Sequence, residues 1–488
     1  MNHNNWTLRE IAALILILAA VFAYSLPTLT SKPRLFFDEG FVIEEAHNFA
    51  EFGVLDTIVA PNTFSGLPHI ASSIGFSVTV PLAGVFKVFG FSIEAARAYA
   101  LMWIAAFLIA AYAFARRHFG SQSALLSVAL ITTFAPLYGN GRPVMGDIPG
   151  FTYLLIALLI EPLSLFGAGV FLGLCLVARP SLYVIAVATF LVYLIYKYRT
   201  SCAIPLIKTG SGIALAVIAS FLLYYPSWLS GEWWRATLSF IQNPSFGMTG
   251  TLERVLYNLV SFGGESTLIY FAVLAALIGI AYFLGGRSEW SRAVVFFSTL
   301  FCGLIFTYFL RSPGWFKYLL PLQMLIFFFL PSAIEILFSY AKAHAPKYIE
   351  RIVPSIATTF AVAALVVLQS VQLLYLSDIY YSTDTEDTAR YVSEHLDPQD
   401  TVATIHAAQV AMLFPSDKKY SYFVVNEDLA VGENPLEFSE DKRATYLVMP
   451  RDDLSQFSSE FDKEHMRVLA DHYSLTQSYG RFNVFKLK

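Results

Sequence analysis

Long apolar runs separated by short polar stretches set the pattern of this chain of 488 residues. A helix needs about 20 mostly apolar residues to cross a bilayer, and about 17 are enough. The pattern therefore predicts several membrane-spanning helices, of which the shortest, Ile148–Ile160, needs help from its flanks. The runs without any Asp, Glu, Lys or Arg include Ile11–Ser31, Ala98–Ala115, Ile148–Ile160, Pro162–Ala178, Thr209–Gly231, Ser266–Gly286, Ala293–Leu310 and Ile352–Ser377.

Basic residues of the short loops set the orientation, because Lys and Arg mark the cytoplasmic side of a membrane protein. Four clusters qualify: Arg116-Arg117-His118, Lys197 to Lys208, Arg287 with Arg292, and Lys342 to Arg351. Placing all four on the cytoplasmic side predicts about 11 transmembrane helices, with a tight hairpin of two helices through Glu161-Pro162. An odd number of crossings leaves the C-terminal tail on the extracytoplasmic side.

One apolar segment does not fit as a further crossing. Residues 58–86 carry no charge, but Pro61, Pro68 and Pro81 interrupt them, together with three glycines. A crossing here would also place Arg116-Arg117 on the wrong side. We expect juxtamembrane or re-entrant helices within a large first external loop, residues 31–93.

The tail has a different composition from the rest of the chain. Overall, 56% of the residues are hydrophobic and 14% are charged, against about 25% charged in soluble domains. From Asp378 to Lys488 there are 20 acidic and 11 basic residues, a net charge of −9, and the remainder carries +5. We therefore expect a membrane domain of residues 1–377 and a soluble α/β domain of residues 378–488. The tail's predicted helices and strands are Thr385–Leu396, Thr401–Ile405, Tyr420–Val425, Ala444–Met449, Asp453–His465 and Arg481–Leu487.

An adjacent acid pair, Asp38-Glu39, follows the first apolar run. Ionised side chains at a membrane edge pair with other charges, face a cavity or perform chemistry. An alternative is that Asp38 caps the helix expected to follow it. Asp147, close to Arg142 in the predicted second external loop, could likewise belong to a functional site or cap the helix that follows it.

Cations and aromatic residues accompany these acids on the external face. Arg179 and Lys317-Tyr318 each open a predicted helix, where they could extend to lipid headgroups or hold a lipid phosphate, Arg as a bidentate fork and Lys as a point charge. Glu232-Trp233 lies in a stretch typical of an interfacial aromatic belt, although aromatic residues also line sugar sites.

The order of several motifs resembles the GT-C glycosyltransferases, and within them the bacterial protein O-mannosyltransferases and lipid A aminoarabinose transferases. The likeness covers about the first 340 residues. The motifs are Asp38-Glu39-Gly40, Gly90-Phe91-Ser92 with Ala95-Ala96-Arg97, Arg116-Arg117-His118-Phe119-Gly120, Arg142-Pro143 with Asp147, Arg179-Pro180, and Trp315-Phe316-Lys317-Tyr318-Leu319-Leu320-Pro321.

This resemblance implies inverting transfer of a sugar from a polyprenyl-phosphate donor to an acceptor outside the cytoplasm. The acceptor is lipopolysaccharide, another glycolipid or a protein hydroxyl, and nucleic acid is not a partner. By match to the family motifs, the catalytic residues are Asp38 as general base, Glu39 in support and Asp147 as a second acid. The residues implied to bind the donor phosphate are Arg179, Lys317, Tyr318 and Arg142.

Two positions depart from the family pattern. Relatives carry a His-Pro-Pro-Leu type stretch where this chain has Gly66-Leu67-Pro68-His69-Ile70, and the lipid A type has Lys-Gly at Arg179-Pro180. The second difference argues against the aminoarabinose activity itself. His69, Glu232 and Trp233 are further candidates for substrate binding.

Two other functions compete with this one. An oligosaccharyltransferase would hold a divalent metal ion between carboxylates such as Asp38, Glu39 and Asp147, whereas the leading interpretation requires no cofactor. A transporter or flippase would place ionisable groups at mid-membrane, and the predicted spans are nearly free of them. In every case we expect a multi-pass protein of the inner (plasma) membrane, with its active site and C-terminal domain extracytoplasmic.

Overall fold

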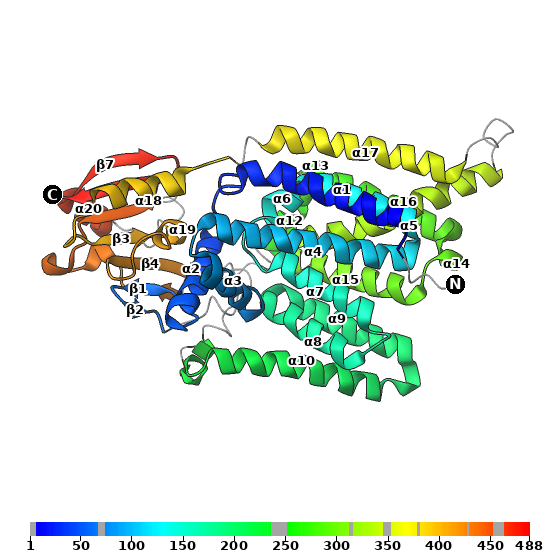
Figure 1. Ribbon diagram of the computed structural model, residues 1–488, viewed down its shortest axis with the longest axis horizontal. Helices are drawn as coiled ribbons and strands as arrows, with labels where there is room; N and C mark the ends of the chain where they lie inside the picture. The colour runs from blue at the N-terminus through cyan, green and yellow to red at the C-terminus, as the bar shows by residue number, and fades with distance from the viewer. Residues whose placement is uncertain are drawn as a thin grey trace.

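A bundle of long helices and a smaller sheet domain at one end make up the protein (Figure 1). The structure, a computed structural model, describes residues 6–66, 74–231, 233–235, 251–264, 266–311, 316–344, 353–377, 381–426, 429–451 and 463–488. Within these ranges, eight helices are long and apolar enough to cross a membrane. They are formed by α1 (Leu8–Ser25), α4 (Ile93–Phe119), α9 (Pro180–Tyr198), α10 (Ala203–Leu223), α13 (Ser266–Ala281) with its continuation, α15 (Arg292–Arg311), α16 (Leu320–His344) and α17 (Pro354–Ser377).

A ninth crossing is bent. Helices α5 (Ser121–Thr133) and α6 (Ala135–Gly141) pass the same test together but meet at 64°. Pro136 lies in the first turn of α6, where a proline fits a helix start but cannot continue the hydrogen bonds of the preceding helix. The predicted hairpin through Glu161-Pro162 is formed by α7 (Asp147–Ile160) and α8 (Leu165–Ala178), each of 14 residues. The fold class is thus the predicted one, and the total of about 11 crossings stays a prediction.

The basic loops gather at one end of the bundle, far from the sheet domain. In Figure 1 the start of α1, the end of α4 and the short α14 (Arg287–Glu289) all lie at the right, and the sheet lies at the left. Glu10 pairs with Arg116 at 3.3 Å, which ties the first turn of α1 to the last turn of α4. Likewise Lys197, at the end of α9, pairs with Glu161 after α7. This arrangement is the one that the charge pattern requires.

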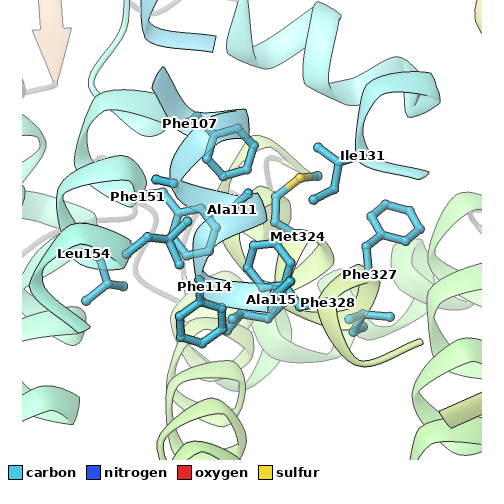
Figure 2. Close-up of a cluster of buried hydrophobic side chains, with 14 of the residues drawn as sticks. Phe107, Ala111, Phe114, Ala115, Ile131, Phe151, Leu154, Met324, Phe327 and Phe328 are labelled. Carbon is cyan, nitrogen blue, oxygen red and sulfur yellow. The ribbon is translucent and has the colours of Figure 1, made fainter. Parts of the chain in front are cut away.

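Helix α16 runs through the centre of the bundle. Of its apolar window 83% is buried, against 17–22% for α1, α10, α13 and α17, whose outward apolar faces suit a lipid environment. Figure 2 shows part of the core between α4, α5, α7 and α16. The labelled side chains are Phe107, Ala111, Phe114, Ala115, Ile131, Phe151, Leu154, Met324, Phe327 and Phe328.

The segment predicted as the first external loop, residues 31–93, contains no helix longer than 16 residues within its described part. It consists of α2 (Phe37–Phe52), a hairpin of β1 (Ile58–Ala60) and β2 (Thr63–Phe64), and α3 (Phe76–Phe89). Helix α3 has 14 residues, fewer than a crossing normally needs. Helix α2 packs between α3 and the sheet domain, so its position there brings the acid pair to the junction of the two domains.

The C-terminal domain has a mixed six-stranded sheet of order β5-β4-β3-β6-β8-β7. Strand β3 is parallel to β4 and β6, and the outer pairs are antiparallel. The elements are α18 (Asp384–His395), β3 (Val402–Ile405), α19 (Ala408–Ala411), β4 (Lys419–Asn426), β5 (Leu429–Val431), β6 (Tyr446–Pro450), α20 (Lys463–His472), β7 (Tyr473–Tyr479) and β8 (Phe482–Leu487). The predicted α/β class is confirmed, and the predicted helix 453–465 falls mainly outside the described residues.

The remaining helical segments are short or lie at the ends of longer helices. They are η1 (Leu26–Thr28), η2 (Arg199–Ser201), η3 (Ser227–Leu229), α12 (Thr251–Gly264), η4 (Tyr282–Gly286), η5 (Phe316–Leu319), η6 (Pro435–Glu437) and η7 (Glu440–Lys442). Segment η5 is the entry to α16.

Candidate active site

Asp38 and Lys317 form an ion pair across the junction between α2 and η5. Lys317 Nζ lies 3.0 Å from Asp38 Oδ2, although the two residues are 279 positions apart in the chain. The ammonium group of Lys317 also lies 4.9 Å from the centre of the Phe36 ring. The Lys317 side chain is 12% exposed, and that of Asp38 is 38% exposed. Asp38 is therefore accessible to a second molecule while it is held in place.

A second ion pair joins Asp147, at the start of α7, to Arg179, between α8 and α9. Both side chains are nearly buried, at 2% and 7% exposure. One oxygen of Asp147, Oδ1, is buried and has no hydrogen-bond partner. Tight backbone packing brings the two residues together, since a Cβ atom at Gly146 would overlap the carbonyl oxygen of Ala178.

Tyr318 links the two ion pairs. The Arg179 guanidinium lies 5.2 Å from the centre of its ring, and the Lys317 ammonium lies 5.9 Å from the same centre. The ring is buried and packs edge-on against Tyr308. The arrangement places two cations and two carboxylates around one aromatic ring, as expected for a site that binds an anion next to a proton acceptor.

Glu39 occupies a different environment from its neighbour Asp38. Its side chain is fully buried and forms an ion pair with Arg97 of α4, in which Nη2 donates to Oε2 at 2.6 Å and Nε lies 2.5 Å from Oε1. The backbone N–H of Val144 donates to Glu39 Oε1 at 2.9 Å, and Arg97 donates to the Pro33 carbonyl at 3.1 Å. Glu39 thus joins α2 to α4 and to the loop before α7. From this buried position Glu39 fixes the first turn of α2, and its role in a reaction stays a prediction.

Arg97 was not among the candidate site residues. Its signal in the sequence was a single Arg in the first turns of an apolar helix, a position at which an ionisable residue needs a partner. The motif Ala95-Ala96-Arg97 contains it, but only the structure identifies Glu39 as that partner.

Other candidates lie apart from the two ion pairs or outside the described residues. Arg142 donates to the carbonyl oxygens of Ser25 at 3.0 Å and Thr28 at 3.1 Å, and its burial, followed by the nearby charge of Arg97, lowers its pKa to about 10. Arg142 thus holds the end of α1, and its predicted contact with a donor phosphate stays a prediction. Trp233 is buried against Trp234 and Phe221. His69 and Glu232 lie outside the described residues.

An apolar cavity of about 130 Å³ lies beside Leu319 of η5, the segment that also carries Lys317 and Tyr318. Its walls come from α13, α15 and the start of α16, and Gln323 is the polar residue in its lining. Leu319, directly after Tyr318, is one of the lining residues. The apolar lining includes Leu268, Phe271, Phe306, Leu319, Leu322 and Ile326.

The described residues contain no group of three or more His, Cys, Asp or Glu side chains that could hold a metal ion. Asp38 and Asp147 each already have a cationic partner. These pairs fit an anion site better than a site for a divalent cation, because a bound metal ion would have to compete with Lys317 and Arg179.

The chain is similar to known membrane glycosyltransferases in part of its sequence and in its fold. The family model for dolichyl-phosphate-mannose-protein mannosyltransferases matches residues 78–224. ArnT from Cupriavidus metallidurans bound to undecaprenyl phosphate superposes with a TM-score of 0.63 at 12% identity, covering 97% of each chain. The apo oligosaccharyltransferase of Archaeoglobus fulgidus gives a TM-score of 0.59 at 11% identity, covering 97% of this chain and 74% of that one.

A third structure, the Archaeoglobus fulgidus oligosaccharyltransferase AglB in complex with an inhibitory peptide and a dolichol-phosphate, gives a TM-score of 0.55 at 11% identity, with 97% and 74% coverage. No curated protein matches the chain by sequence. The matched structures share the arrangement of a helical membrane bundle with this chain over nearly all of its length. In fold, the protein therefore resembles the GT-C glycosyltransferases, and over residues 78–224 its sequence also matches the mannosyltransferase family model.

Proposed function

We propose that the protein is an integral-membrane, inverting glycosyltransferase that moves one sugar from a polyprenyl-phosphate donor to an acceptor hydroxyl. The observation that carries this proposal is an accessible carboxylate, Asp38, that pairs with Lys317, while a second cation, Arg179, lies over the neighbouring Tyr318 ring. The apolar cavity beside Leu319 adds a place for the first part of a lipid tail. The similar ArnT and AglB structures hold undecaprenyl phosphate and dolichol-phosphate.

Asp38 is the general base in this reaction. It accepts the proton of the acceptor hydroxyl as that oxygen attacks the anomeric carbon of the donor sugar. The bond between this carbon and the phosphate oxygen breaks on the opposite face, which inverts the configuration. General-base assistance of this kind contributes about 10²–10⁴-fold to a rate.

Lys317 and Arg179 stabilise the leaving group. The polyprenyl phosphate departs with its negative charge, so cations aimed at its oxygens stabilise the transition state more than the ground state. An ammonium group has three N–H donors, and Lys317 therefore can bind a phosphate oxygen while it keeps its contact with Asp38. Asp147 orients Arg179, and Tyr318 supplies a hydroxyl at the same place.

We place this site and the C-terminal domain outside the cytoplasm. The support is that the basic loops gather at the end of the bundle opposite the sheet domain (Figure 1), as the distribution of Lys and Arg in membrane proteins favours. Acceptors on that face are lipopolysaccharide, other glycolipids and protein hydroxyls.

The test is mass spectrometry of envelope lipids and proteins from cells with the wild-type gene, without it, and with the Asp38→Asn variant. We expect one hexose, pentose or uronic acid to be missing from the same molecule in the last two. Identical envelopes in all three strains would contradict the proposal.

A metal-dependent oligosaccharyltransferase is the second candidate, favoured by the fold likeness to the archaeal enzyme and by the unpartnered Asp147 Oδ1. A chelator separates the two candidates in membranes that carry out the transfer. Unchanged transfer supports the metal-independent reaction, and loss of transfer that Mg²⁺ or Mn²⁺ restores supports the alternative.

A further inference from the structure

The C-terminal domain is attached to the helix that carries Asp38. Helix α2 begins at Phe37, and the domain contacts it through α19 and β4. Three Phe rings interlock at this contact, with centres 5.0 Å apart for Phe37 and Phe41, and 4.9 Å apart for Phe41 and Phe423. The domain therefore packs on the first two turns of α2.

Gly40 permits the closest approach. A Cβ atom at this position would overlap the backbone of Ala408 and Gln409 in α19. Gly40 follows Asp38 by two residues in the same helical turn. Any side chain at position 40 would force α19 away from α2, or α2 away from its present position.

A buried ion pair fastens the same contact. Lys419 of β4 lies 2.8 Å from Glu44 Oε1, and the two side chains are 3% and 2% exposed. Lys419 also donates to the Ala411 carbonyl at 3.2 Å, and the backbone N–H of Ile58 donates to Glu44 Oε1 at 3.0 Å. This one ion pair thus joins α2, α19, β1 and β4.

The chain that leads into α2 is held by the same domain. Arg481 pairs with Asp384 at 2.7 Å and donates to the Leu35 carbonyl at 3.2 Å. The backbone N–H of Ser382 donates to the Ser31 carbonyl at 3.1 Å. Residues on both sides of Asp38 are therefore anchored to the C-terminal domain, while the Asp38 carboxylate itself pairs with Lys317 of the membrane bundle.

We propose that the C-terminal domain is a positioning element of the active site, and that Gly40 and the Glu44–Lys419 pair set where Asp38 stands relative to Lys317. The proposal rests on the glycosyltransferase function proposed above. A displacement of about 1 Å of a reacting group costs roughly 100-fold in rate. The bundle holds α2 through Glu39 and Arg97, and the C-terminal domain holds it through Gly40 and Glu44.

The experiment uses the full chain in lipid nanodiscs and four variants. Gly40→Ala and Lys419→Met disturb the contact. The double variant Glu44→Gln with Lys419→Met removes both charges, and the side-chain oxygen at position 44 can still accept the N–H of Ile58. Replacing a whole buried ion pair costs far less stability than breaking it, so this variant should keep the contact. Gly84→Ala is the matched control, since a Cβ atom at Gly84 of α3 meets open space.

Three quantities are measured: hydrogen exchange of the α2 amides, affinity for undecaprenyl phosphate, and the glycosylated product in complemented cells. We expect Gly40→Ala and Lys419→Met to raise exchange in the first turns of α2 and to lower product by about 100-fold. Affinity for undecaprenyl phosphate should stay close to the wild-type value, because Lys317 and Arg179 are intact. The double variant should recover both exchange and product.

Unchanged exchange of α2 in Gly40→Ala and Lys419→Met would overturn the proposal. So would loss of product that the double variant does not restore, or a loss shared by Gly84→Ala. The exchange measurement requires no transfer activity, so it tests the anchoring of α2 even if the proposed function is wrong. In that case, product would not depend on Asp38, whereas exchange would still respond to Lys419→Met.

Discussion

Replacing Asp38 by Asn separates the proposed chemistry from folding. The side chain keeps its shape, and the amide oxygen still accepts a hydrogen bond from Lys317, but no group remains to take up a proton. The Asp38 side chain is 38% exposed and that of Lys317 is 12% exposed. Because the amide still offers Lys317 an acceptor, the loss should stay near the roughly 0–1 kcal/mol of a solvent-accessible ion pair. We therefore expect the free energy of unfolding to fall by no more than about 1 kcal/mol.

The effect on the reaction is much larger. Loss of a general base lowers a rate by about 10²–10⁴-fold, which raises the activation free energy by about 3–5 kcal/mol at roughly 1.4 kcal/mol for each factor of ten. Affinity for undecaprenyl phosphate should stay near the wild-type value, since Lys317, Arg179 and Tyr318 remain.

The assay combines the purified full chain with a membrane extract as the source of lipid-linked sugars, and mass spectrometry detects the product. Thermal unfolding and undecaprenyl-phosphate binding are measured on the same samples. Glu39→Gln serves as the comparison, because it disturbs a buried pair and should destabilise the protein. Transfer by Asp38→Asn within a few-fold of wild type would refute the assignment, as would a loss that only follows the folded fraction.

Three further outcomes follow from individual contacts. Arg97→Met leaves the buried Glu39 without its cation, which should cost about 3–5 kcal/mol of stability; thermal unfolding measures this, and an unchanged midpoint would contradict it. Lys317→Met removes a charged hydrogen-bond donor worth about 1.5–3 kcal/mol, so affinity for undecaprenyl phosphate should fall by roughly 10- to 100-fold; equal affinity would mean that the phosphate binds elsewhere. Burial raises the pKa of Asp56 from 3.8 to about 6. Its protonated form therefore stabilises the fold at low pH, and this contribution is lost as pH rises from about 4 through about 6. Asp56→Asn should weaken the decline in stability between about pH 4 and 6.5, which an unaltered pH profile would disprove.

Sequence patterns predicted the helices well because each long apolar run is a local property. The apolar runs Ala98–Ala115 and Ala293–Leu310 fall within α4 and α15. Arg179 and Lys317 lie at the starts of α9 and of the η5–α16 segment, as predicted. The sequence also suggested that Asp38, Asp147, Arg179 and Lys317 share one end of the bundle, and the structure brings them together around Tyr318.

The partners of these residues could not be read from local pattern. Asp38 and Lys317 are 279 residues apart, and Glu39 and Arg97 are 58 apart, so tertiary packing decides which charges meet. Glu39 and Asp38 are adjacent in the chain, yet one is fully buried and the other is half-exposed. Strands β5 and β7 were missed as well: β5 has three residues, and β7 is polar along most of its length.

The Glu44–Lys419 pair restricts which substitutions this protein tolerates, both in evolution and in engineering. Each partner alone would leave a bare charge in a dry interface, which is costly, so the two positions must be inherited or exchanged together. A chimera that takes residues 381–488 from a relative but keeps residues 31–66 of this chain would join mismatched surfaces. A working chimera would therefore have to exchange two separate segments together, residues 31–66 and residues 381–488.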